Sequence, residues 1–146
     1  MTEQQSAPRP SRPSTAAGEV VAGLVNDGSA ARVARAAVRL AAVRQCGVRF
    51  VQVLTAHAHE DAGSATFGIA LRALRGQHRI PVAFEVLSGH PGRTLVERSA
   101  TATALVVGAD TRGASSGTAR YCRTHARCPV VTASAPDEVL EPASAR

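Results

Sequence analysis

Five short apolar runs alternate with longer segments of helical spacing, and this alternation constrains the fold more than any other feature of the chain. The runs cover residues 20–25, 48–54, 81–87, 104–107 and 129–132. Short Val-rich runs bounded by turn residues are typical of strands that are buried on both faces. Strands that alternate with helices require right-handed crossovers and a parallel sheet. We therefore predict an α/β fold: a single-domain, three-layer α/β/α structure with a five-stranded parallel sheet.

The helical segments carry their own start and stop signals. Asp27 or Ser29 is expected to cap a first helix that runs to about residue 45, with Val43 on its apolar side and Gly47 as its left-handed stop. A second helix is predicted over residues 62–76, with Phe67 and Leu71 facing inward. The third opens at residue 91, and the fourth covers residues 118–125.

Both ends of the sequence differ in composition from its middle. Residues 1–18 hold three of the eight prolines and almost no apolar side chain larger than Ala. Such a segment cannot bury enough surface to offset the entropy of ordering it. We expect disordered tails at residues 1–18 and 134–146, and one folded domain at residues 19–133.

Every basic side chain is an arginine, because the 17 basic residues include no lysine; 11 acidic residues leave a formal charge of +6. Arginine binds phosphates well, so a nucleic-acid partner is one hypothesis. A GC-rich coding bias would produce the same composition, and aromatic residues that stack on bases make up 3% of the chain. Nucleic-acid binding is therefore not the favoured interpretation.

Neither a signal-peptide pattern nor an apolar run of about 18 residues is present, so we expect a cytoplasmic chain that does not enter a membrane. Cys46, Cys122 and Cys128 form an odd set without CxxC spacing, which favours free thiols. His57 and His59 lack a third ligand at a fixed spacing, so no metal site is predicted. No catalytic constellation is found, and we expect no enzyme.

The small and polar residues follow the first and fourth predicted strands. A strand order of 3-2-1-4-5 would bring these two loops together at the point where the order reverses, which is where ligands bind in open parallel sheets. Glycines let backbone N–H groups approach a phosphate, and a helix start adds positive potential. The candidate anion-binding residues of the second loop are Gly108, Gly113, Ser115, Ser116, Gly117 and Thr118. A plain turn with Ser or Thr capping is the alternative interpretation for this loop, and a helix cap is the alternative for Asp27.

Several of these stretches together resemble the universal stress protein (UspA-like) family. The first strand with its Asp-Gly-Ser turn at residues 20–29 resembles the start of that family's domain. Residues 92–108 are similar to its helix and strand before the nucleotide loop, and residues 119–131 to its closing helix and Cys-Pro-Val strand. The resemblance covers residues 20–133 and implies the adenine-nucleotide alpha-hydrolase-like fold.

The resemblance also implies a ligand and a partner. Many members of the family bind ATP or another adenine nucleotide through a loop written G-x2-G-x9-G-[ST]. By position, Asn26 and Asp27 would lie by the adenine or ribose, Val53 would line the adenine pocket, and Gly108 would start the phosphate loop. Gly117 and Thr118 would end that loop. The family commonly forms homodimers through the last strand, which here begins at Pro129 and ends at Thr132.

This chain departs from the family pattern in the phosphate loop. Thr111 stands where the second loop glycine is expected, and only seven residues separate Gly108 from Ser116. The loop is thus about five residues shorter than in nucleotide-binding members, which leaves fewer N–H donors for a triphosphate. The favoured hypothesis is a regulatory stress-response module, acting through a dimer and a regulatory protein partner, in which nucleotide binding is weak or lost. The alternatives are an adenine-nucleotide-binding stress protein with at most slow ATP hydrolysis, and an Arg-rich nucleic-acid binder.

Overall fold

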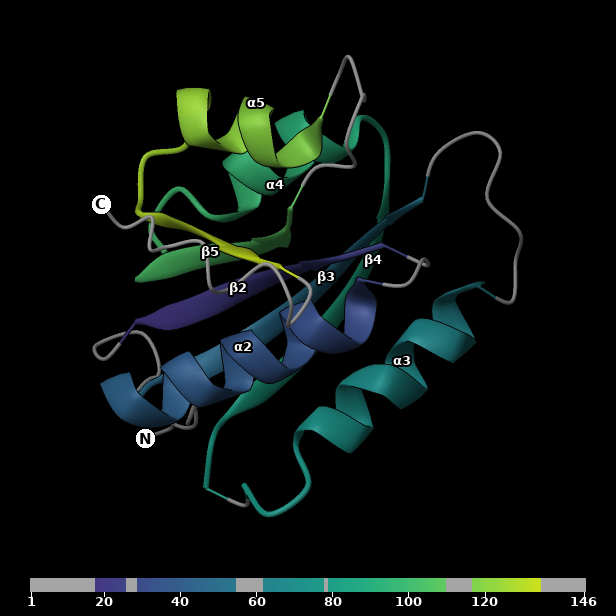
Figure 1. Ribbon diagram of the computed structural model, residues 1–146, viewed down its shortest axis with the longest axis vertical. Helices are drawn as coiled ribbons and strands as arrows, with labels where there is room; N and C mark the ends of the chain where they lie inside the picture. The colour runs from purple at the N-terminus through teal and green to yellow at the C-terminus, as the bar shows by residue number, and fades with distance from the viewer. Residues whose placement is uncertain (1–17, 26–28, 55–61, 78, 110–116, 135–146) are drawn as a thin grey trace, which may run out of the picture.

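One sheet of five parallel strands runs through the middle of the molecule in the order β4-β3-β2-β5-β6 (Figure 1). The computed structural model describes residues 18–25, 29–54, 62–77, 79–109 and 117–134. The strands are β2 (Glu19–Leu24), β3 (Gly47–Leu54), β4 (Val82–Ser88), β5 (Ala104–Gly108) and β6 (Val130–Ala133). In chain order this is 3-2-1-4-5, which confirms the predicted topology. Apart from Gly18 and Ser134, the two predicted tails lie outside the described residues.

Two pairs of helices cover the two faces of the sheet and complete the three layers. Helices α2 (Ala30–Arg44) and α3 (Ala62–Ala73) lie on one face, and α4 (Pro91–Arg98) and α5 (Thr118–His125) lie on the other (Figure 1). Each face has its own apolar core, because alternate residues of a strand point to opposite sides. Phe50 of β3 faces α2, is fully buried and packs 6.3 Å from Phe84 between ring centroids. Burial of a side chain of this size contributes about 2 to 3 kcal/mol.

The end of α2 differs from the prediction that Gly47 is its left-handed stop. Gln45 adopts the left-handed conformation instead (φ 56°, ψ 49°), and its N–H donates to the carbonyl groups of Ala41 and Ala42. Gly47 already belongs to β3. A Cβ atom there would lie 2.9 Å from the carbonyl oxygen of Pro81, so the glycine serves the close approach of two chain segments.

Three side chains that were predicted to face inward are exposed. Phe67 and Leu71 of α3 are 44% and 52% exposed, and Val43 of α2 is 74% exposed. Helix α3 lies beyond the middle of the sheet and packs chiefly against α2, so Thr66 and Ala70 are the buried residues among its described side chains. Phe67 and Leu71 therefore lie at the border of the sheet. Among the described aromatic rings, Phe67 contacts only that of Phe84 on the edge strand, at 5.0 Å between ring centroids.

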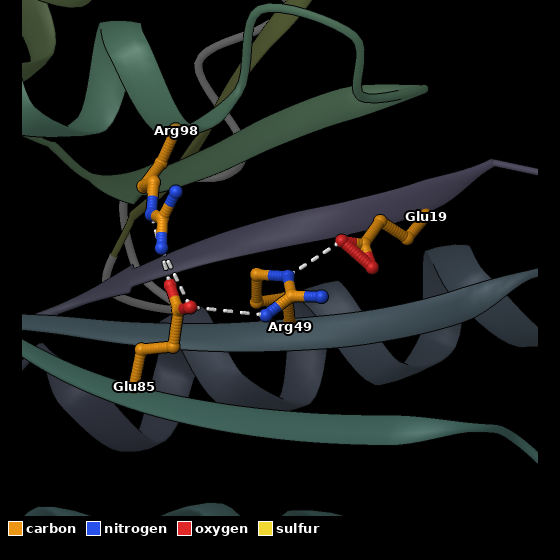
Figure 2. Close-up of polar contacts among 4 residues, drawn as sticks. All are labelled: Glu19, Arg49, Glu85 and Arg98. Carbon is orange, nitrogen blue, oxygen red and sulfur yellow. Dashed lines mark hydrogen bonds and ion pairs between the residues drawn. The ribbon is translucent and has the colours of Figure 1, made fainter. Parts of the chain in front are cut away.

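Charged side chains connect neighbouring strands and α4 on the α4 side of the sheet (Figure 2). Arg49 of β3 donates from Nε to Glu19 Oε1 at 2.6 Å, and its Nη1 lies 3.2 Å from Glu85 Oε2. Arg98 of α4 makes a bidentate contact to Glu85: its Nε donates to Oε1 at 3.0 Å and its Nη2 donates to Oε2 at 2.7 Å. The hydrogen bond to Glu19 raises the pKa of Arg49, which keeps its guanidinium charged. We call these four residues the charge ladder; it joins β2, β3, β4 and α4.

The described part of the chain contains no helix that is both long enough and apolar enough to cross a bilayer. Its three cysteines are free thiols: Cys46 and Cys122 are buried, and Cys128 is half-buried.

Candidate functional site

Strands β2 and β5 end side by side at the carboxyl edge of the sheet. The two strands are direct parallel neighbours, so both end at this edge. A Cβ atom on Gly108 would lie 2.8 Å from Ser29 Oγ and 3.0 Å from Ser29 Cβ. The turn before α2 is therefore in contact with the end of β5. The described residues that flank the two loops are thus in contact, while residues 26–28 and 110–116 of the predicted site lie outside the described residues.

Ser29 stands at the N-cap position of α2, but its backbone is helical (φ −89°, ψ −15°) and its side chain makes no capping hydrogen bond. The prediction that Ser29 caps this helix through its side chain is therefore wrong. The hydroxyl lies against Gly108 instead. Asp27, the other predicted cap, is outside the described residues.

A cavity of about 510 Å³ opens where α4 and α5 begin. Two predicted site residues line it: Gly117, which is the extended N-cap residue of α5, and Thr118, the first residue of that helix. The other described lining residues are His90, Pro91, Arg120, Tyr121 and Thr124. The described lining thus carries an arginine and no carboxylate, and the starts of two helices add positive potential. This arrangement favours an anionic ligand.

Rings from both helices form one wall of the cavity. Tyr121 lies between two imidazoles, with centroid distances of 5.3 Å to His90 and 4.3 Å to His125. Gly92 permits this packing, because a Cβ atom there would stand 2.7 Å from Tyr121 Cδ1. His90 is also the N-cap of α4: its Nδ1 accepts the N–H of Arg93 at 3.1 Å, so the ring is held in a fixed orientation.

The other predicted site residues have different positions. Val53 is 7% exposed and belongs to the apolar core beneath α4 and α5, and it is not among the described lining residues of the cavity. Gly108 packs against Ser29. Asn26, Asp27, Gly113, Ser115 and Ser116 lie outside the described residues, and so do His57 and His59.

Sequence reasoning missed the ring wall. Neither His90 nor Tyr121 is among the site residues predicted from the sequence. One signal was available, because Tyr121 stands one helical turn after Thr118 and so shares its face of the helix. The packing of Tyr121 on Gly92, 29 positions earlier in the sequence, has no local signal.

No profile of a known protein family matches the sequence, and no curated protein matches it.

Solved structures, in contrast, match the fold over most of its length. A universal stress protein in complex with cAMP has a TM-score of 0.64 at 17% identity, covering 80% of this chain and 97% of that one. A universal stress protein from Archaeoglobus fulgidus in complex with dAMP has the same TM-score and coverage at 22% identity. One from Arabidopsis thaliana with AMP bound has a TM-score of 0.60 at 18% identity, covering 86% and 99% of the two chains. The chain therefore has the fold of the universal stress proteins, as its residues predicted.

Proposed function

We propose that this chain is a non-enzymatic regulatory module of universal-stress-protein type. Its fold supports the proposal, and so does the order of the resembling motifs along residues 20–131.

The module would act as a homodimer joined through β6. This strand is at the edge of the sheet, and Val131 is 39% exposed there. An apolar edge strand is a template for pairing with another chain. Pairing of two β6 strands would leave the carboxyl edges and the cavities of both copies accessible to a regulatory protein partner.

A second candidate function is the binding of an adenine nucleoside monophosphate, and the cavity is the observation that favours it. Its volume of about 510 Å³ lies in the range of small-molecule sites. The aromatic side chains of His90 and Tyr121 in the lining suit a base, while Arg120 and the start of α5 suit a phosphate. The shortened loop leaves few donors for a triphosphate, whereas a monophosphate needs fewer, and the solved structures of this fold named above hold cAMP, dAMP and AMP.

Two measurements test the nucleotide proposal. Denatured protein is first examined by absorbance and mass spectrometry for a co-purified nucleotide. Thermal unfolding is then followed with millimolar AMP, cyclic AMP and ATP. Binding stabilises the protein by about 2 to 3 kcal/mol at a hundred times the dissociation constant, so AMP is expected to raise the melting temperature more than ATP does.

The variant Thr118→Val removes a hydroxyl from the lining and should reduce the shift with AMP. Thr101→Val, in the exposed turn after α4, is the matched control and should leave the shift unchanged. A melting temperature that none of the three nucleotides changes would exclude nucleotide binding and leave the regulatory module alone.

A further inference from the structure

The layer formed by α2 and α3 carries positive charge only. Residues 29–54 and 62–84 contain no Asp and no Glu. Over the same stretch, α2, α3 and the turn after α3 contribute arginines on the outer surface, whereas the charge ladder is on the other face of the sheet (Figure 2). The exposed arginines are Arg35, Arg39, Arg44, Arg72, Arg75 and Arg79.

A cleft of about 150 Å³ lies within this layer, between the two helices. Arg35 of α2 and Arg72 of α3 line it, and both side chains are exposed. Ala31, Ile69 and Ala73 complete the lining. An arginine from each helix beside an apolar surface suits a segment that presents carboxylates next to aliphatic side chains, because guanidinium groups form paired hydrogen bonds with carboxylates.

The chain itself contains such a segment a few residues after the end of β6. Strand β6 ends at Ala133, which is 8% exposed and belongs to the same apolar core as Val33 and Ala34 of α2. Residues 137–141 read Asp-Glu-Val-Leu-Glu, three carboxylates around two aliphatic side chains. An extended chain advances about 3.3 Å per residue, so residue 138 can lie roughly 13 Å from Ser134, and residue 141 roughly 23 Å. The distance to the first two turns of α2 is thus within reach.

We infer that residues 137–141 dock in the cleft between α2 and α3, with carboxylates on Arg35 and Arg72. Opposite charge, the exit of the chain beside α2 and the aliphatic pair next to Ile69 all favour this occupant. The face of a second copy is a poor occupant, because two layers of arginines repel one another. The docked segment would cover the arginines, so its release would expose a cationic surface. The inference is independent of nucleotide binding.

The absence of lysine allows a direct test in the full-length chain. In the variants Arg35→Lys and Arg72→Lys the new side chain keeps its charge and, apart from the amino terminus, is the only amine. A carbodiimide joins an amine to a carboxylate only when the two are in contact. Peptide mapping by mass spectrometry should find both new amines joined to residues 137–141. The matched control is Arg123→Lys, which is exposed on α5 at the opposite face, and it should give at least tenfold less of this product.

Equal coupling in all three variants, or no coupling to residues 137–141, would overturn the inference. An equal mixture of isotopically heavy and light protein shows whether the bond is within one chain; products that join heavy to light peptides would assign the cleft to the tail of a second copy and also overturn it. A third outcome would assign the surface to nucleic acid instead. In that case no tail product forms, and a DNA duplex binds the wild-type protein more tightly than the Arg35→Gln and Arg72→Gln variants.

Discussion

Single glycines decide how closely segments of this molecule approach one another. Gly108 admits the side chain of Ser29, Gly92 admits the ring of Tyr121, and Gly47 admits the carbonyl of Pro81. In each pair a Cβ atom would come within 3.0 Å of its neighbour. The first two contacts position the carboxyl edge and the cavity wall, so Gly108, which resembles part of a ligand motif in the sequence, also has a packing role in the fold.

Gly108→Val should destabilise the protein because its side chain meets Ser29 and Val33. Overpacking of this kind costs about 1 to 3 kcal/mol, which urea unfolding measures. Gly68→Ala is the control: nothing lies within 4 Å of a Cβ there, and alanine in a helix should stabilise by about 0.5 to 1 kcal/mol. Gly108→Val with unchanged stability would contradict the contact with Ser29.

Cys46 should make stability depend on alkaline pH. Burial raises the pKa of its thiol, so the folded protein keeps the proton at a pH where the unfolded chain has lost it. The unfolded state then binds fewer protons, and the free energy of unfolding falls as pH rises above about 8.5, by at most about 1.4 kcal/mol per pH unit. Unfolding in urea from pH 7 to 10 measures this slope. The variant Cys46→Ala should have a shallower slope; identical slopes would refute the assignment.

At the scale of elements, the two faces of the sheet are covered unequally. Helix α2 has 15 residues and lies under the middle of the sheet, whereas α4 and α5 have eight residues each. The strands β3 and β4 therefore carry the charge ladder on the side where helical cover ends (Figure 2). Glu85 is the central member, because it contacts both Arg49 and Arg98 and so ties the edge strand to α4.

Glu85→Gln should lower the free energy of unfolding by about 1 kcal/mol at low salt, because the ladder is only partly buried and water screens its charges. The side chain of Glu85 is 23% exposed. Glu97→Gln removes the same charge from an exposed position on α4 and should change stability by less than about 0.5 kcal/mol. Chemical unfolding at low and high salt distinguishes the two, since the difference between them should shrink in salt. An equal loss in both variants would show that only net charge matters.

At the scale of the whole molecule, both edge strands of the sheet expose apolar side chains, but the elements beside the two edges differ. Val86 on β4 is 46% exposed and Val131 on β6 is 39% exposed. The edge at β4 adjoins the exposed Phe67 and the charge ladder, whereas β6 adjoins the short helix α5. The proposed dimer uses the β6 edge.

Val131→Lys should convert the proposed dimer to a monomer, since a charge on an edge strand opposes pairing. Sedimentation velocity at micromolar concentration measures the change. Val86→Lys is the matched control on the opposite edge and should remain dimeric. A wild-type monomer, or a dimer that only Val86→Lys disrupts, would contradict the proposal for β6.

Local signals predicted much of the fold and less of the site. Strand bounds agreed within about one residue, and Pro91 correctly marked the first turn of α4. The stop of α2 was missed, because Gln45 can adopt a left-handed conformation without a glycine signal. The exposed face of α3 was missed, because helical spacing shows which side is apolar and not where a neighbouring element ends.

The amino-acid sequence by itself determined the five strands, the helices between them and the strand order that places β2 beside β5, because apolar spacing and right-handed crossovers act along short stretches of chain. Only the tertiary structure decided that His90 and Tyr121 share a cavity wall, that Arg35 and Arg72 line one cleft and that Glu85 holds two arginines. These contacts join residues far apart in the chain. Their formation depends on how whole elements pack, which no local pattern records.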